Sequence, residues 1–270
     1  MAIVNRTPDS FYDRGATFSD AAAMDAVDLA VADGADIVDI GGVKAGPGAE
    51  VDVAEEIRRA VPLITAVRQR HPDVLVSVDT WRGAVARAAC DAGVDLINDS
   101  WGAVDPTLGE VAAEYGVGVV CAHTGGTPPR TRPHRVRYAD VVVDVITDVT
   151  TQARRLVELG VARDAILIDP AHDFGKNTWH GLELVRRADE LVATGWPVLM
   201  SLSNKDFVGE TLGVGLTDRL EGTLAATALA AAAGVRIFRA HQVAATRRTV
   251  EMVASVVGDR PPVGCVRALA

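Results

Sequence analysis

The chain has 270 residues and a mass of 28.3 kDa, and 49% of its residues are hydrophobic. This is enough apolar material for a large core, which excludes a disordered chain. The 27 basic and 36 acidic residues give a net charge of −9, which argues against nucleic acid or an anionic membrane as the main partner. The basic residues include only three lysines, Lys44, Lys176 and Lys205.

The cysteines and the hydrophobic runs indicate a cytoplasmic protein. Cys90, Cys121 and Cys265 form neither a Cys-x-x-Cys pair nor an even disulfide framework, and their surroundings predict buried, reduced thiols. No apolar run reaches the roughly 18 to 20 residues of a membrane span, and the N-terminus lacks the pattern of a signal peptide. We therefore expect a cytoplasmic protein that does not contact a membrane.

Eight short apolar runs, rich in β-branched residues, recur along the chain. They cover residues 2–4, 36–40, 74–78, 95–97, 118–121, 165–168, 197–200 and 235–238. Because they are continuously apolar and do not alternate, they are typical of parallel strands that are covered on both faces.

Amphipathic segments separate these predicted strands. They cover residues 20–33, 53–70, 83–92, 139–159, 182–193, 217–233 and 244–257. Ser19 and Thr217 are candidate caps at the starts of two of them, and glycines such as Gly34 and Gly160 mark the ends of others.

The strand–helix unit repeats about every 34 residues, without a break in composition. Eight such units predict one domain over residues 1–270, a (β/α)8 TIM barrel. The alternative, a doubly wound sheet, needs a Gly-x-Gly-x-x-Gly turn after the first strand, and the glycines from Gly41 to Gly48 have the wrong spacing for it.

A polar residue closes each predicted strand. These residues are Asn5, Asp39, Asp79, Asn98, His123, Asp169, Ser201 and His241. Each of them alone is equally well explained as the cap of the next helix. In a barrel, however, the carboxyl ends of the strands meet at one mouth, so the whole set predicts a shared binding pocket.

The residue types at this mouth favour one kind of ligand. The first strand ends in Asn5-Arg6-Thr7, without the His-x-His of metal-dependent hydrolases. Three successive strand-end carboxylates, which bind magnesium in other barrels, are also missing, because Asn98 and His123 follow Asp79. The amide and carboxylates of Asn98, Asp79 and Asp169 instead suit a heterocycle that is rich in N–H groups.

Cations are predicted on the opposite side of the mouth. Lys205 follows the seventh strand, and Arg239 and His241 stand two residues apart on the eighth, so their side chains share a face and can grip one anion. Because barrels often bind phosphate beside strands seven and eight, we expect a polar heterocycle that carries phosphate. The alternative for Arg239 is a buried salt bridge.

Motifs in order over essentially the whole chain resemble those of dihydropteroate synthases. They are Asn-Arg-Thr-Pro-Asp-Ser-Phe at 5–11, Asp-Ile-Gly-Gly at 39–42, Ser-Val-Asp-Thr at 77–80, Ile-Asn-Asp at 97–99, Ile-Asp-Pro with Phe-Gly-Lys at 168–176, Ser-x-Lys at 203–205 and Arg-x-His at 239–241. The resemblance implies a reaction in which p-aminobenzoate attacks the methylene of 6-hydroxymethyl-7,8-dihydropterin diphosphate and expels pyrophosphate.

The resemblance also implies a role for each matching residue. The catalytic set would be Asp9, Asp79, Asp169 and Lys205, with Asn98, Arg239, His241 and Phe11 binding substrate and Asn5 ligating Mg²⁺. Asp79, Asn98, Asp169 and Lys205 would hold the pterin, and Arg239 and His241 the phosphates. Asp9 and Phe11 would lie on a mobile loop that closes over p-aminobenzoate. The family further implies a homodimer formed through the late helices.

Three segments depart from the family pattern on the p-aminobenzoate side. Where the family has Gly-Gly-Glu-Ser-Thr-Arg-Pro-Gly, residues 41–48 read Gly-Gly-Val-Lys-Ala-Gly-Pro-Gly, so the arginine is lost and Lys44 gives no equivalent bidentate contact. The family's Ser-Arg-Lys-Ser is Ser-Asn-Lys-Asp at 203–206, and the Asp206 carboxylate would repel that of p-aminobenzoate by about 1 to 4 kcal/mol at about 4 Å.

The third departure is the loop after the sixth strand, where the family's Asp-Pro-Gly-x-Gly-Phe reads Asp-Pro-Ala-His-Asp-Phe at 169–174. A solvated loop with a helix cap is the alternative reading of the two added titratable groups. Together the departures predict a paralogue that binds a pterin or phosphate, with strongly reduced or absent synthase activity. An active synthase and a related barrel acting on another acceptor or ligand remain the alternatives.

Overall fold

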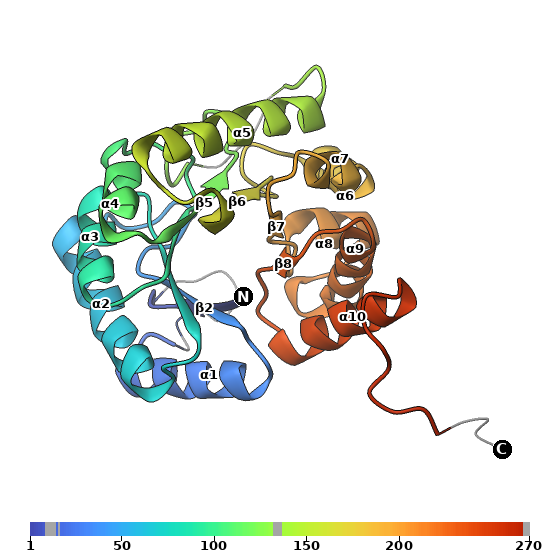
Figure 1. Cartoon of the computed structure of the whole chain (residues 1–270), viewed down its shortest axis with the longest axis horizontal. Coiled ribbons are helices and arrows are strands. Elements are labelled where there is room, and N and C mark those ends of the chain that lie inside the picture. Colours follow the sequence, from blue (N-terminus) through green and yellow to red (C-terminus); the bar gives the residue numbers. More distant parts are fainter. Residues whose placement is uncertain (9–14, 16, 132–136, 267–270) are drawn as a thin grey trace.

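The computed structural model describes residues 1–8, 15, 17–131 and 137–266, and its fold is a (β/α)8 barrel (Figure 1). The eight strands are β1 (Ala2–Asn5), β2 (Ile37–Gly41), β3 (Leu75–Asp79), β4 (Leu96–Asp99), β5 (Gly118–Ala122), β6 (Ile166–Asp169), β7 (Leu199–Met200) and β8 (Ile237–Phe238). All neighbouring strands are parallel. The predicted fold and the eight strands are therefore confirmed.

Two isolated β-bridges close the barrel. Strands β1 to β6 form one sheet in sequence order and β7 pairs with β8. The bridge between Ala2 and Ala240 joins β1 to the end of β8, and the bridge between Ile168 and Val198 joins β6 to the start of β7. Both β7 and β8 are shorter than predicted, because only these single bridges continue the pairing at their ends.

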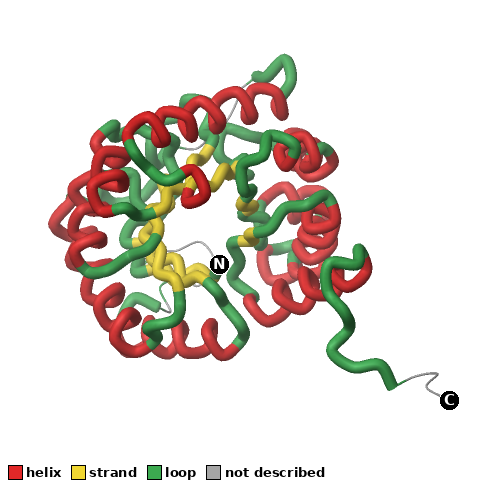
Figure 2. The backbone as a smooth tube through the Cα atoms, viewed as in Figure 1, coloured by secondary structure: helices red, strands yellow, loops and turns green. Residues whose placement is uncertain are grey.

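The helices ring the strands (Figure 2). They are α1 (Asp20–Ala32), α2 (Val53–Arg70), α3 (Gly83–Asp91), α4 (Thr107–Tyr115), α5 (Val141–Leu159), α6 (Thr178–Arg186), α7 (Ala188–Val192), α8 (Asp206–Leu212), α9 (Leu220–Ala232) and α10 (Val243–Val256), with 3-10 turns η1 (Arg163–Ala165) and η2 (Leu216–Asp218). The predicted helix over 182–193 is two helices, since Arg187 leaves helical geometry.

Of the two predicted helix N-caps, one is confirmed. Ser19 caps α1, and its hydroxyl accepts a hydrogen bond from the Ala22 N–H at 3.3 Å. The prediction for Thr217 is wrong: this residue lies in η2, where the Asp218 N–H bonds to the Gly215 carbonyl, and α9 begins three residues later. Gly160 ends α5 with a φ of 106°, which glycine adopts without steric cost.

Alternation along the strands divides the core into two parts. Leu96, Val120, Leu167 and Leu199 form a small cluster that Ile237 packs against. Residues of the opposite strand face, such as Ile97 and Ile168, belong to the larger core that packs against the helices. Because side chains two residues apart share a face, the polar residues that follow the small cluster are directed to one mouth of the barrel.

Two further predictions concern the burial of the cysteines and the absence of membrane-spanning helices. Cys90 and Cys121 are buried as predicted, but Cys265 is exposed, because it lies in the extended segment that leaves the barrel after α10 (Figure 1). Within the described residues, no helix combines the length and the apolar character needed to cross a membrane.

Candidate functional site

Arg239 lies at the centre of a polar cluster in the barrel mouth. Its Nε is 2.6 Å from Asp39 Oδ2, and its Nη2 is 2.9 Å from Asp79 Oδ2. The Asn98 amide donates to the same Asp39 oxygen at 3.1 Å, and the Ser100 hydroxyl donates to Asp79 Oδ1 at 2.7 Å. The structure thus brings together residues at the ends of β2, β3, β4 and β8 in one mouth, as predicted, but Arg239 lies among the carboxylates and not opposite them. Ser100, one residue beyond β4, was not foreseen.

Arg239 offsets one of the two carboxylate charges in this cluster. Burial raises the pKa of Asp79 to about 6, although Arg239 opposes the shift. Burial also opposes the charge of Arg239, but Asp39 and Asp79 outweigh it and raise the pKa of the guanidinium. Arg239 therefore forms the buried salt bridge that was the alternative to an anion grip, and an incoming anion has to compete with two carboxylates.

His241, the second residue expected to bind the anion, is uncharged. Burial, with Arg239 and Lys205 nearby, lowers the pKa of His241 to about 3, so the imidazole is neutral at neutral pH. The Ser203 hydroxyl lies 3.1 Å from its Nδ1 and also accepts the His241 backbone N–H. His241 can therefore offer a neutral hydrogen bond to a ligand but no charge, which corrects the prediction.

Asp169 lies at the end of β6 and is 5% exposed. Its Oδ1 accepts the Ala171 backbone N–H at 2.7 Å, and its Oδ2 accepts the Ser201 hydroxyl at 3.3 Å. Burial raises the pKa of this carboxyl, while Ala171 and Lys205 favour its charged form. The carboxyl is thus fixed in orientation by its neighbours and sensitive to a donor that approaches it.

Aromatic rings stand beside Lys205. The Lys205 Nζ lies 5.3 Å from the centre of the Phe174 ring, a distance typical of a cation–π contact. Phe174 meets Trp101 edge to face, with ring centres 4.9 Å apart, and Trp101 meets Trp81 in the same way at 6.4 Å. Neither tryptophan was singled out from the sequence, although both follow strand ends, at β3 and β4, and this position is the signal that could have found them.

Asn5 is the expected metal ligand. A Cβ built on Gly41 would lie 3.8 Å from both Asn5 Oδ1 and Asp79 Oδ2, so the glycine leaves space between an amide oxygen and a carboxylate. Within the described residues, no group of three His, Cys, Asp or Glu side chains could hold a metal by itself. One amide oxygen fits Mg²⁺ only where phosphate and water supply the other ligands, which is how this ion is usually bound.

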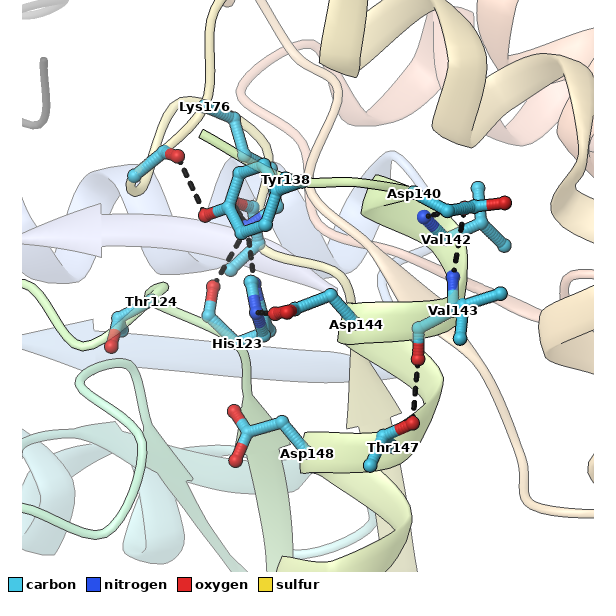
Figure 3. Close-up of polar contacts among 12 residues, drawn as sticks. His123, Thr124, Tyr138, Asp140, Val142, Val143, Asp144, Thr147, Asp148 and Lys176 are labelled. Carbon is cyan, nitrogen blue, oxygen red and sulfur yellow. Dashed lines mark hydrogen bonds and ion pairs between the residues drawn. The ribbon is translucent and has the colours of Figure 1, made fainter. Parts of the chain in front are cut away.

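His123 does not belong to the mouth. Its Nε2 lies 2.9 Å from Asp144 Oδ1 on α5, and its Nδ1 lies 2.8 Å from the Lys176 Nζ (Figure 3). The side chain follows Cys121 on the face of β5 that packs against the helices. The prediction that all eight strand-end residues share one pocket is therefore wrong for His123.

The loop between β6 and α6 is packed against the barrel and is not a solvated loop. His172 is 0% exposed, and its ring centre lies 5.3 Å from that of Phe207. Asp173 Oδ2 accepts the Asp206 backbone N–H, the first of α8, at 2.9 Å. The Asp206 side chain turns instead to Arg219, whose Nη1 it meets at 2.9 Å. The first N–H of α8 is thus bonded to Asp173, and the repulsion of p-aminobenzoate expected from Asp206 stays a prediction.

The backbone and side-chain N–H groups of Asn204 bond to neighbouring protein groups. The residue is buried and has a φ of 56°, a conformation that asparagine tolerates better than most residues. Its side-chain amide donates to Gln242 Oε1 at 3.1 Å, and its backbone N–H donates to the Thr223 hydroxyl at 3.1 Å. Asn204 therefore serves the packing between the β7 loop and the helices that follow.

Of the first loop, the structure describes the base. Arg6 is buried and donates to the carbonyls of Phe18 and Arg59, and it pairs with Asp20. These bonds hold the two ends of the loop together, a role that the sequence did not reveal. Asp9 and Phe11 lie outside the described residues.

The chain was compared with families and known proteins. The family model described as "Pterin binding enzyme" matches residues 1–241. A Mycobacterium tuberculosis protein named "Inactive dihydropteroate synthase 2" is 70% identical over 274 residues, covering 100% of this chain and 86% of the relative. The dihydropteroate synthase of Escherichia coli is 37% identical over 261 residues, covering 96% and 92%.

Solved structures agree with this assignment. A Yersinia pestis dihydropteroate synthase in complex with a sulfonamide drug has a TM-score of 0.90 at 34% identity, covering 96% of this chain and 94% of that one. A dihydropteroate synthase from Coxiella burnetii in complex with pteroic acid has a TM-score of 0.87 at 31% identity, covering 96% and 93%. The chain therefore belongs to the pterin binding enzyme family, as a divergent paralogue of dihydropteroate synthase.

Proposed function

We propose that this protein binds a pterin, or a pterin that carries phosphate, and that it has strongly reduced or no dihydropteroate synthase activity. The observation that carries the second half of the proposal is the hydrogen bond from the Asp206 N–H to Asp173. The first alternative, an active synthase, requires this position to be open to the carboxylate of p-aminobenzoate, whereas the second, a barrel that acts on another acceptor, does not.

The pterin side of the mouth supports binding. Asp79, Asn98, Asp169 and Lys205 are all present, on strand ends or just after them, and the carboxyls of Asp79 and Asp169 are both largely desolvated. Acceptors of this kind suit the N–H groups of a pterin ring, because a buried carboxylate gains more from a matching donor than an exposed one does.

The p-aminobenzoate side supports a loss of synthase activity. The Asp173 carboxylate already occupies the first N–H of α8, Asn204 is turned inward, and residues 43–46 lack the hydroxyls and the arginine of the family. A second carboxylate approaching Asp173 would be repelled by about 1 to 4 kcal/mol at about 4 Å. Since the carboxylate of p-aminobenzoate has no free partner there, the acceptor is not held in line for attack.

We expect any Mg²⁺ to arrive with the ligand. Asn5 would supply one amide oxygen, and the phosphates and water would supply the rest. When bound, the ion would neutralise charge on the diphosphate. Arg239 and His241 would face the same phosphates, Arg239 only after exchanging part of its contact with Asp39 or Asp79 for the anion.

Calorimetric titration tests the proposal directly. We expect heat of binding when 6-hydroxymethyl-7,8-dihydropterin diphosphate is added in the presence of Mg²⁺, and none when p-aminobenzoate is added to a complex with pterin and pyrophosphate. Asp169→Asn should abolish pterin binding, whereas Asp164→Asn, in η1 at the opposite end of β6, should leave it unchanged. Saturable binding of p-aminobenzoate would contradict the proposed loss of the acceptor site.

A further inference from the structure

Lys176 is a buried amine that the proposed function does not use. It is 7% exposed, and its Nζ lies 2.8 Å from His123 Nδ1 and 2.9, 3.2 and 2.9 Å from the carbonyl oxygens of His123, Ala171 and Phe174. Four acceptors around one nitrogen fit an ammonium group, which has three protons to donate, better than a neutral amine.

The bonds of Lys176 join the segment after β5 to the loop between β6 and α6. His123 directly follows β5, whereas Ala171 and Phe174 lie in the loop between β6 and α6. Within this loop, Ala171 and Asp173 have left-handed φ values of 49° and 70°, which are costly for residues other than glycine. The ammonium bonds to the Ala171 carbonyl at the start of this strained segment and to the Phe174 carbonyl directly after it, so it stabilises the conformation in which Asp173 bonds to α8.

One route connects Lys176 to solvent through side chains. His123 is 1% exposed, and because its Nδ1 accepts from the ammonium, its Nε2 carries the proton that is donated to Asp144 at 2.9 Å. The Asp144 side chain is 52% exposed at the surface of α5 (Figure 3). Amine, imidazole and carboxylate thus form a hydrogen-bonded chain that runs from the interior to water.

We propose that Lys176, His123 and Asp144 form a proton relay that sets the charge of Lys176 and, through it, the conformation of the loop between β6 and α6. In the outward direction, Lys176 gives a proton to His123 Nδ1, the proton on Nε2 passes to Asp144, and Asp144 releases it to water. The reverse steps recharge the amine. Each step is a proton transfer between hydrogen-bonded atoms, and no other reactant is needed.

The surroundings place the change of charge in the accessible pH range. Burial lowers the pKa of Lys176 to about 7, and nearby carboxylates counteract the shift only in part. The charged or titratable groups that face it are Asp169, His172 and Asp173 from β6 and its loop, Asp144 and Asp148 from α5, His180 from α6 and His123 from β5. Burial lowers the pKa of all three histidines, so the carboxylates are the groups that favour the charged lysine.

The lysine content of the chain makes the proposal measurable. Only Lys44, Lys176 and Lys205 contribute signals to a protein labelled with ¹³C and ¹⁵N lysine, and the signal missing from Lys176→Met identifies Lys176. We expect the Lys176 ε-carbon to titrate with a midpoint near pH 7, and the backbone amides of Ala171 and Gly175 to shift with the same midpoint. A Lys176 signal that stays charged up to about pH 9, or loop amides that do not follow it, would overturn the proposal.

Matched variants separate the relay from simple electrostatics. Asp144→Asn and Asp148→Asn each remove one carboxylate from α5, but only Asp144 bonds to His123. Both should lower the Lys176 midpoint, whereas only Asp144→Asn should slow, several-fold, the exchange of the Lys176 ammonium protons with water. His123→Gln keeps an acceptor for Lys176 but cannot pass a proton, and it should slow exchange in the same way. Equal exchange rates in all of these proteins would contradict a relay.

The consequence for ligands rests on the function proposed above. If the ammonium orders the loop, pterin affinity should fall as the pH rises through the Lys176 midpoint, and Lys176→Met should bind weakly at every pH. The lysine titration needs no ligand. A protein that shows the titration but binds no pterin would therefore contradict the proposed function and leave the relay standing.

Discussion

At the scale of single residues, Arg239 determines how the mouth is organised. It pairs with both Asp39 and Asp79, which lie on neighbouring strands, and its single positive charge reduces the repulsion between them. The same contacts keep the guanidinium from being a free anion site. A pair of this kind adds little net stability, because desolvation offsets the attraction, but removing one partner leaves buried charge without compensation.

Substitution of Arg239 should therefore cost more than the salt bridges themselves contribute. We expect Arg239→Met to lower the free energy of unfolding by about 3 to 5 kcal/mol in urea titrations at neutral pH. Arg247→Met removes an exposed pair with Asp36 and should change it by less than about 1 kcal/mol. Equal effects of the two substitutions would show that the cluster is not desolvated as the structure indicates.

His172 should make stability depend on pH. Burial lowers its pKa from 6.5 to about 3 in the folded protein, so between these values the unfolded chain binds a proton that the folded protein does not. Stability from this group is present above about pH 6.5 and is lost as the pH falls toward 3. His172→Phe should reduce the loss between about pH 6.5 and pH 4 by up to about 3 kcal/mol, measured by urea unfolding across that range. If the substitution left the loss of stability at acidic pH unchanged, the burial of a neutral imidazole would be contradicted.

The sequence predicts a site residue correctly where its place follows from the alternation of side chains along a strand. Asp39, Asp79, Asn98 and Arg239 meet because each stands two residues beyond an interior position of its strand. The same rule places His123 outside the mouth, because it follows Cys121 on the helix-facing side of β5, so the prediction erred by treating every polar residue at a strand end alike. The inward turn of Asn204 and the pairing of Asp206 with Arg219 depend on tertiary contacts that no local pattern encodes.

At the scale of elements, we propose that three loops account for the loss of synthase activity. They follow β2, β6 and β7, and the structure shows that the last two act together, because Asp173 from one binds the first N–H of α8 after the other. The sequence shows that both loops depart from the family pattern, but it does not show the hydrogen bond that joins them.

A graft tests whether these loops are responsible. Replacing residues 43–46 by Glu-Ser-Thr-Arg together with Asp173→Gly, Asn204→Arg and Asp206→Ser should restore pyrophosphate release to at least ~10-fold above background, since it reopens the start of α8 and returns the lost arginines. The same graft without Asp173→Gly should remain at background, because the internal carboxylate still blocks the position. Equal activity of the two grafts would contradict the role given to Asp173.

The elements themselves were largely predictable, and their errors have local causes. Continuous apolar runs located all eight strands because a covered parallel sheet needs them. The single helix expected over 182–193 fails at Arg187, whose guanidinium is bonded to Asp140, Glu183 and Glu190. Such a node of three carboxylates from different segments cannot be inferred from helical periodicity.

At the scale of the whole molecule, the outer helices α9 and α10 leave apolar side chains exposed to solvent. Thr246 is the sole buried residue of α10. The exposed fractions are 66% for Leu229 of α9, 64% for Met252 and 72% for Val256. The helices α9 and α10 pack against each other (Figure 1). The homodimer through the late helices that the family resemblance implies would cover these exposed apolar side chains, and it stays a prediction.

Sedimentation equilibrium checks this assembly. We expect a mass of twice 28.3 kDa for the native chain, and a monomer for Leu229→Glu and for Met252→Glu, because a buried charge at an apolar interface is costly. Val143→Glu, which changes an exposed apolar residue on α5, should leave the dimer intact. A monomeric native protein would contradict the dimer.

The central claim is that the pterin side of the site persists while the acceptor side is closed, and pyrophosphate release is its most direct test. The native protein is incubated with 6-hydroxymethyl-7,8-dihydropterin diphosphate, Mg²⁺ and p-aminobenzoate, beside an active dihydropteroate synthase. We predict that the native protein releases little or no pyrophosphate in response to p-aminobenzoate. Release that depends on p-aminobenzoate, at the rate of the active enzyme, would contradict the account.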